Sequence, residues 1–240
     1  MSCDCNDCNG NQEMPDMPEM PEIPDGGMPL TPHVLIENAI ALSADKVFIV
    51  GEIDEELACN VCRQILILNE RNNMTGSLDP IHLIINSPGG DLNAAWMICD
   101  IMDTIECPVV TYGFGLIGSA AFIIYMNGDY GLRFATKNTQ FMSHTFTMVI
   151  GGKRGDHIAH ASEITRMHKR MIDHYMKCTG LTKAEIEDKL LVEHDIWLTA
   201  ANAKALRIVD KIIPVRKNHY SDVKKAEEKA KAQKELKAKA

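Results

Sequence analysis

Residues 81–114 read IHLIINSPGGDLNAAWMICDIMDTIECPVVTYGF, and the class of fold follows from their pattern. Residues 81–85 form a short apolar run that ends at turn residues, as expected of a strand buried on both faces. Apolar residues then recur at helical spacing over 92–105, until Pro108 stops the helix. A second buried strand is predicted at 109–114. Strand, helix and strand in this order predict an α/β fold with a parallel sheet and crossover helices.

The same alternation extends upstream, where 47–50 reads as a strand and 57–68 as a helix. The chain has 240 residues, 45% of them hydrophobic, which suffices for one core. We therefore predict a single domain over 30–215, with appendages at 1–29 and 216–240.

Composition excludes several classes of function. A net charge of −8 argues against a nucleic-acid-binding protein, which needs a dense basic surface. The sequence contains no run of eighteen apolar residues, so we predict no membrane span. The first residues lack the charged and then apolar pattern of a leader. The cysteines within 30–215 lie scattered in apolar surroundings, which is typical of reduced, buried thiols. We expect a soluble, cytoplasmic protein that binds neither nucleic acid nor membrane.

The two appendages differ from the domain and from each other. Residues 14–25 repeat an apolar residue, proline and an acid: MPDMPEMPEIPD. Proline at every third position forbids helix and ladder strand but suits polyproline II, so this segment is either a disordered acidic arm or a partner-binding or pore-lining element. Cys3, Cys5 and Cys8 precede it without a fourth ligand, so no metal site is predicted. Residues 221–240 predict a solvated basic helix.

Ser119 is the first candidate for chemistry. It follows the Gly-Leu-Ile-Gly turn at 115–118 and precedes a segment expected to be helical at 122–126. A serine at a helix start lies beside free backbone N–H groups, where an oxyanion is stabilised. The same pattern also fits tight packing or an ordinary helix cap. His144, in a strand-like run, and Asp195, in a turn before 196–198, are equally ambiguous taken singly.

Short motifs that span residues 34–215 together resemble the ClpP peptidases in order and in nearly their spacing. They are Ile84-Ile85-Asn86-Ser87-Pro88-Gly89-Gly90, the 115–121 stretch, Arg133-Phe134, Met142-Ser143-His144, Leu198-Thr199-Ala200 and Ile208-Val209-Asp210. The resemblance implies that Ser119, His144 and Asp195 form the catalytic triad. It also implies that the backbone N–H groups of Gly90 and Ala120 form the oxyanion hole.

The resemblance further implies a ClpP/crotonase-like spiral of βαβ units with a protruding handle helix. The implied activity is that of a serine endopeptidase, itself independent of ATP, which cuts unfolded or extended polypeptides through an acyl-enzyme and uses no cofactor or metal. The implied assembly is a homo-oligomer of heptameric rings, stacked as a tetradecamer around a chamber, with an AAA+ unfoldase as partner.

The handle helix is expected over 156–178. Its apolar residues recur every three or four positions, at Ile158, Ala161, Ile164, Met167, Met171 and Tyr175. This stripe suits packing against another ring, or against the helix's own subunit.

Five positions depart from the family pattern. Thr145-Phe146 stands where Gln-Pro is usual, His194 replaces an arginine, and Ala120 replaces a methionine. Arg207 stands where a left-handed glycine is usual, which costs a non-glycine residue about 1 kcal/mol. The departures suggest a divergent relative, of cellular or bacteriophage origin.

Several alternatives remain open at this point. A phage head-maturation peptidase acting on capsid or scaffold proteins would share the fold, and an inactive scaffold or modulator subunit would keep the fold without turnover. A signal-peptide-peptidase relative would need an apolar anchor. A crotonase-type acyl-CoA enzyme would share the oxyanion geometry, but the serine and histidine positions argue against it.

Overall fold

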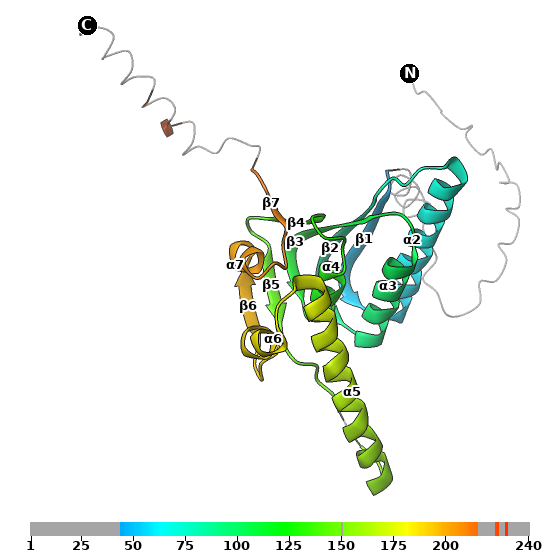
Figure 1. Ribbon diagram of the computed structural model, residues 1–240, viewed down its shortest axis with the longest axis vertical. Coiled ribbons are helices and arrows are strands. Elements are labelled where there is room, and N and C mark those ends of the chain that lie inside the picture. The colour runs from blue at the N-terminus through cyan, green and yellow to red at the C-terminus, as the bar shows by residue number, and fades with distance from the viewer. Residues whose placement is uncertain (1–43, 150, 216–223, 226–228, 230–240) are drawn as a thin grey trace, which may run out of the picture.

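The computed structural model describes residues 44–149, 151–215, 224, 225 and 229 (Figure 1). The predicted appendage at 1–29 lies outside these residues, and so does nearly all of 216–240. The Met-Pro-acid repeat and the three N-terminal cysteines therefore remain sequence predictions.

Strands and helices alternate along most of the described chain. They are β1 (Lys46–Ile53), α2 (Glu55–Thr75), β2 (Ile81–Gly90), α3 (Leu92–Thr104), β3 (Val109–Gly118), α4 (Ala120–Met126), β4 (Arg133–Thr136), β5 (Gln140–Ser143), α5 (Arg154–Thr179), α6 (Lys183–Lys189), β6 (Ile196–Thr199), α7 (Ala200–Ala205) and β7 (Lys211–Ile213).

The sheet has the strand order β1-β2-β3-β4-β7, and these strands are parallel. β3 divides its outer edge between two partners, because residues 111–113 pair with β4 and residues 116–118 pair with β5. β6 then adds to β5 in the antiparallel direction. The sheet therefore branches at β3, and the catalytic candidates lie at this branch.

The helices α2, α3 and α4 cover one face of the sheet (Figure 1). α2 buries Ala58, Val61, Ile65 and Leu68, which recur at helical spacing. Buried strand residues such as Ile49 and Leu83 meet this layer and form the core. The predicted α/β class with crossover helices is confirmed.

Several boundaries differ from the sequence prediction, and α2, for example, spans Glu55–Thr75 where 57–68 was predicted. β2 and β3 extend to Gly90 and Gly118, because their parallel ladders resume beyond register shifts near Gly51 and Asn86. β5 is shorter than the alternating pattern suggests and ends at Ser143, because its partner β6 is only four residues long.

Helix α5 is the predicted handle and projects from the body of the protein (Figure 1). Packing against the helix's own subunit accounts for part of the apolar stripe, and packing against another ring stays a prediction. Met171 and Tyr175 are buried within the subunit, whereas Ile158 is 58% exposed on the projecting half. Arg207 has the expected left-handed backbone, with φ 59°, and its guanidinium donates to the Gly180 carbonyl at 3.2 Å.

Within the described ranges, none of the helices combines the length and apolar character that a membrane span requires.

Candidate active site

Ser119 sits on a sharp turn between β3 and α4. Its backbone has φ 51° and ψ −121°, a conformation that non-glycine residues seldom adopt and that is held by surrounding contacts. The Ser119 N–H donates to the Met142 carbonyl on β5 at 2.9 Å. Strand, strained turn and helix together present the hydroxyl at the end of the sheet, as nucleophile elbows do.

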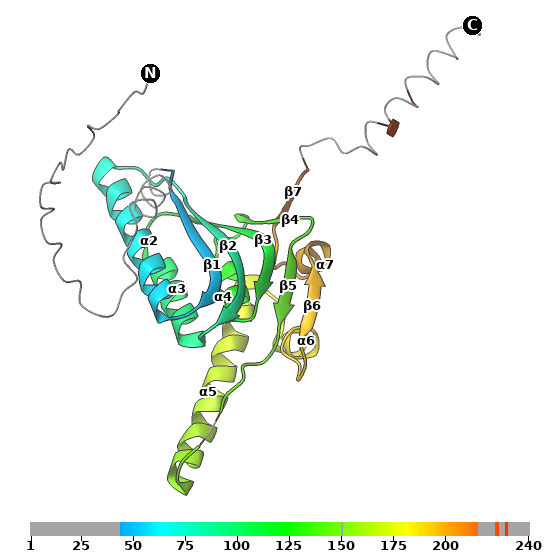
Figure 2. The same ribbon diagram turned by 180° about the vertical axis from the view of Figure 1, so that it is seen from behind.

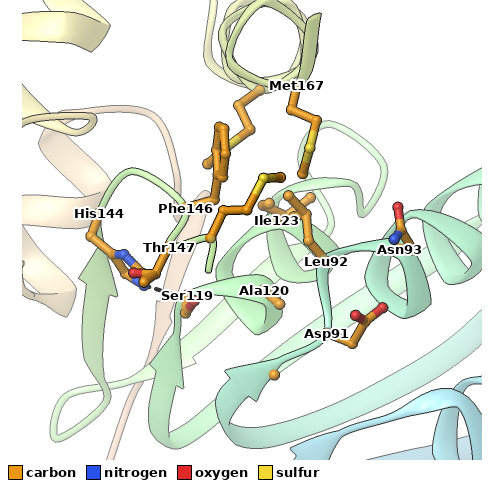
Figure 3. Close-up of a pocket in the computed structure, with 13 residues that line it drawn as sticks. Asp91, Leu92, Asn93, Ser119, Ala120, Ile123, His144, Phe146, Thr147 and Met167 are labelled. Carbon is orange, nitrogen blue, oxygen red and sulfur yellow. Dashed lines mark hydrogen bonds between the residues drawn. The ribbon is translucent and has the colours of Figure 1, made fainter. Parts of the chain in front are cut away.

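His144 follows the last residue of β5 and reaches the serine. Its Nε2 lies 2.8 Å from Ser119 Oγ, which is hydrogen-bonding distance (Figure 3). Helix α5 holds the end of β5, because the hydroxyls of Ser143 on β5 and Tyr175 on α5 lie 2.9 Å apart and both residues are buried. A rigid strand end thus aims the imidazole at the hydroxyl.

Asp195 is brought to the same region but is not joined to the imidazole. It immediately precedes β6, whose residue Ile196 pairs with Ser143 in the antiparallel ladder. Asp195 and His144 therefore lie one step beyond the same ladder end. The Asp195 side chain is exposed, and no hydrogen bond links it to His144 among the described residues.

The Ser-Pro-Gly-Gly element at the end of β2 packs tightly against the serine turn. A Cβ atom on Gly89, whose φ is 107°, would lie 2.6 Å from the Cβ of Ser119 and 2.9 Å from the Ala120 nitrogen. The Ser87 hydroxyl accepts the Gly89 N–H at 3.0 Å and holds the loop. Gly90 lies against β1, where a Cβ would come within 2.1 Å of the Ile53 carbonyl oxygen. Only glycine permits this approach.

Ser119, His144, Gly90 and Ala120 all line one cavity of about 470 Å³. Figure 3 shows side chains from four separate segments around it. The remaining lining residues are Asp91, Leu92, Asn93, Ile123, Phe146, Thr147, Met148, Met167 and Met171. The wall is largely apolar, with the Asp91 carboxylate at the α3 end, so the cavity suits an apolar group held beside the serine.

The sequence analysis missed most of this wall. Phe146 and Met148 enter it from the segment after His144, and Leu92 enters from the start of α3. Phe146 lay in the alternating run 140–146, which we read as a strand, and Met148 was not singled out. Met167 and Met171 were predicted as a stripe for packing, and they also reach the cavity.

A buried histidine supports the floor of the cavity. His174 Nε2 lies 3.0 Å from the carbonyl oxygen of Ile123, and its ring meets Trp96 edge-on with centroids 5.0 Å apart. Burial lowers the pKa of His174 to about 4, although the hydrogen bond to Ile123 raises it and offsets part of this effect. The neutral imidazole therefore donates one hydrogen bond and links α5 to α4.

Two motif residues are structural. Arg133 is fully buried, and its guanidinium makes a bidentate contact with Asp210 at 2.7 and 2.9 Å and donates to the Cys178 carbonyl at 2.8 Å. Burial alone would raise the pKa of Asp210, but hydrogen bonds and charge from Arg133 outweigh it and hold this pKa below its usual value. The pair ties β4 to β7 and to the base of α5.

No group of three or more His, Cys, Asp or Glu side chains in the described residues is placed to hold a metal ion.

Comparison with known proteins places the chain in a family. The family model described as Clp protease matches residues 35–216. The ATP-dependent Clp protease proteolytic subunit 2 of Pseudomonas aeruginosa is 34% identical over 173 residues, which is 72% of this chain and 83% of the relative. The subunit of the same name from Corynebacterium glutamicum is 31% identical over 181 residues, which is 75% of this chain and 87% of the relative.

A solved structure confirms the expected spiral fold. A point mutant of ClpP1 from Listeria monocytogenes superimposes with a TM-score of 0.64 at 32% sequence identity, and the match covers 75% of this chain and 97% of that chain. The match in sequence and the match in fold agree, and the chain belongs to the Clp protease family.

Proposed function

We propose that this protein is a serine endopeptidase that hydrolyses unfolded or extended polypeptides through an acyl-enzyme. The observation that carries the proposal is the 2.8 Å separation of Ser119 Oγ and His144 Nε2 inside an apolar cavity. A hydroxyl has an ordinary pKa too high for attack on an amide, so an adjacent base is what makes it a nucleophile.

In the proposed reaction, Ser119 Oγ attacks the scissile carbonyl carbon while His144 Nε2 takes the hydroxyl proton. The carbonyl oxygen becomes an oxyanion, which the backbone N–H groups of Gly90 and Ala120 stabilise. His144 then returns the proton to the leaving amine, and the C–N bond breaks. Water, activated by the same imidazole, hydrolyses the acyl-enzyme.

Asp195 is proposed as the residue that orients the imidazole. For Nε2 to accept the serine proton, the imidazole must carry its own proton on Nδ1, which requires an acceptor on the far side of the ring. Support for this role comes from the β5–β6 ladder, since Asp195 and His144 each lie one residue beyond its paired end. A change in the side-chain rotamer, or in the turn before β6, is needed to complete this contact.

The proposed assembly is a set of stacked heptameric rings that enclose the active sites. The projecting half of α5, with its exposed Ile158, supplies an apolar surface for contacts between rings. The relatives are named as proteolytic subunits of an ATP-dependent protease. By extension we propose an AAA+ unfoldase as the partner that delivers substrate.

A catalytically weak or inactive ring subunit is the second candidate. The exposure of Asp195 and its lack of a bond to His144 among the described residues favour it. Such a subunit would keep the ring contacts and lose turnover.

Cleavage and particle size test the proposal together. The purified full chain is incubated with a reduced, alkylated model protein and with short peptides, and light scattering gives its mass in solution. We expect cleavage that disappears in Ser119→Ala, from a particle many times the 26.7 kDa of one chain. A fully active monomer contradicts the chamber, and cleavage that survives in Ser119→Ala contradicts the peptidase.

A further inference from the structure

Tyr175 lies near the carboxyl end of α5, where this helix packs beside α4 (Figure 1 and Figure 2). Its ring stacks on Phe122 of α4, with the two centroids 5.7 Å apart. Its hydroxyl lies 2.9 Å from the hydroxyl of Ser143, the last residue of β5. A single buried side chain thus contacts both the helix that begins directly after Ser119 and the strand that ends directly before His144.

The hydrogen bond between Tyr175 and Ser143 is shielded from water. Both residues are buried, and among the described residues no other hydrogen bond reaches either hydroxyl. A buried hydroxyl without a partner destabilises the fold, so each of the two favours the position in which it meets the other. Burial raises the pKa of Tyr175 well above its usual value, although the hydrogen bond to Ser143 lowers it in part. The phenol therefore stays neutral at physiological pH, and the contact does not titrate there.

The other contacts of the β5 end lie within the sheet. The Met142 carbonyl accepts the Ser119 N–H at 2.9 Å on one edge of the strand, and Ser143 pairs with Ile196 on the other. Ladder bonds of this kind run along the plane of a sheet, whereas side chains stand roughly perpendicular to it. The contact from Ser143 to Tyr175 therefore restrains displacement out of the sheet, which the ladder restrains less.

The position of the β5 end matters because His144 follows it directly. Residues 144–149 form neither helix nor strand, so the backbone of His144 is held chiefly from the Ser143 side. His144 Nε2 and Ser119 Oγ lie 2.8 Å apart, and hydrogen bonds of this type weaken beyond about 3.2 Å. A misplacement of about 1 Å in a catalytic group can cost roughly a hundredfold in rate. A small shift of Ser143 is therefore enough to separate the base from the hydroxyl.

We propose that Tyr175 and Ser143 are positioning residues that hold the imidazole of His144 at hydrogen-bonding distance from Ser119. The inference rests on the proposed peptidase function and adds a support on the main-chain side of the imidazole, which is separate from the orienting role proposed for Asp195. Neither Tyr175 nor Ser143 is among the residues that line the cavity beside the serine. Loss of their hydrogen bond should therefore slow the chemical step and leave the binding of substrate unchanged.

A double-mutant cycle in the full chain tests the proposal. Tyr175→Phe removes only the phenol hydroxyl and keeps the ring on Phe122, and Ser143→Ala removes the other hydroxyl. We expect each variant to lose about tenfold in kcat for peptide hydrolysis with KM unchanged. The double variant should lose no more than either single one, because all three break the same hydrogen bond. Unchanged kcat in the single variants, losses that multiply in the double variant, or a change confined to KM would each overturn the proposal.

Thr111→Val is the matched control for a general loss of stability. The Thr111 hydroxyl is buried near the start of β3, away from the candidate site, and donates to the Tyr125 carbonyl on α4 at 3.0 Å. Valine has the same shape without the hydroxyl, so this variant also loses one buried hydrogen bond. It should lower the urea midpoint much as Tyr175→Phe does, but it should retain kcat. An equal loss of kcat in Thr111→Val would show that stability, and not the placement of His144, is responsible.

Hydrogen exchange followed by mass spectrometry gives a readout that does not require catalysis. We expect the backbone amides of residues 141–145 to exchange about fivefold faster in Tyr175→Phe than in the unaltered protein, and at an unchanged rate in Thr111→Val. If the unaltered protein cleaves no peptide, the proposed function fails, and the exchange rates still decide whether Tyr175 holds the end of β5. Unchanged exchange in Tyr175→Phe overturns the inference whether or not the protein cleaves peptides.

Discussion

His144 and Asp195 leave the β5–β6 ladder at the same end, one step beyond the paired residues Ser143 and Ile196. The imidazole contacts Ser119 on one side, whereas among the described residues no hydrogen bond connects it to the Asp195 carboxylate. Antiparallel neighbours at a ladder end are close enough for side chains to meet after a small rotation. The site is thus a formed Ser–His pair with the carboxylate beside it.

Asp195→Asn should lower kcat for peptide hydrolysis by roughly a thousandfold with little change in KM, because an amide no longer fixes the required imidazole tautomer. Steady-state kinetics of the purified variant provide the measurement. Glu193→Gln, an exposed carboxylate two residues away, serves as the control and should retain activity. Equal kcat values for Asp195→Asn and the unaltered protein would remove Asp195 from the mechanism.

Gly89→Ala should lower kcat about a hundredfold, because the new Cβ would overlap Ser119 and shift the nucleophile. Gly131→Ala separates this clash from backbone strain. Gly131 has φ 89°, also unfavourable for alanine, but no atom lies within 4 Å of its added Cβ. Gly131→Ala should lose about 1 kcal/mol of stability from strain alone, and Gly89→Ala should lose more because the clash adds to the strain, as urea unfolding measures; only Gly89→Ala should lose activity. Equal activity losses would argue that strain, and not the contact with Ser119, is responsible.

Phe146→Ala should change selectivity through the cavity wall. Peptides with leucine or phenylalanine before the cut bond are expected to lose roughly tenfold in kcat/KM, because the apolar contact in the cavity is removed. Peptides with alanine there should change little. Val149→Ala lies in the same segment but is 97% exposed, and it should leave both values unaltered. A uniform loss for all peptides would indicate that the segment is disordered by the change instead.

His174 should make stability depend on pH. Its pKa is about 4 in the folded protein because of burial, against about 6.5 when unfolded. Between these values the unfolded state binds the extra proton, so stability falls as the pH drops from 6.5 to 4, by roughly 3 kcal/mol. Apparent urea midpoints at several pH values give the measurement. His174→Gln retains a donor for the Ile123 carbonyl and should flatten the dependence.

The exposed His157 on α5 provides the matched control for this experiment. His157→Gln should follow the pH dependence of the unaltered protein. A His174→Gln variant with an undiminished slope would show that another group causes the acid loss.

The secondary-structure elements that leave a local pattern in the sequence were predicted correctly. The strands around residues 47–50, 81–85 and 109–114 and the helix at 92–105 were found because burial on a sheet and helical spacing leave periodic signals. Ser119 was found with its turn. The extension of β2 to Gly90 was not, because it depends on pairing with β1, a contact remote in sequence.

In the candidate site, too, local features were predicted from the sequence and contacts between distant segments were not. The contact between Ser119 and His144 was expected only from the family resemblance, since nothing local to either residue reveals the other. The cavity wall was missed because Phe146, Leu92 and Met171 come from segments that meet only after folding. The position of Asp195 depends on β6 pairing with β5, and the rotamer of its side chain depends on surroundings that no local pattern records.

Labelling of the full chain with a fluorophosphonate is the sharpest test of the Ser–His pair as a catalytic unit, because this reagent modifies a serine only when a base has activated it. We predict one adduct per chain, located on Ser119 by peptide mass spectrometry, absent in Ser119→Ala and formed at least a hundredfold more slowly in His144→Ala. An unmodified Ser119, or a labelling rate unchanged in His144→Ala, would show that this pair does not activate the serine.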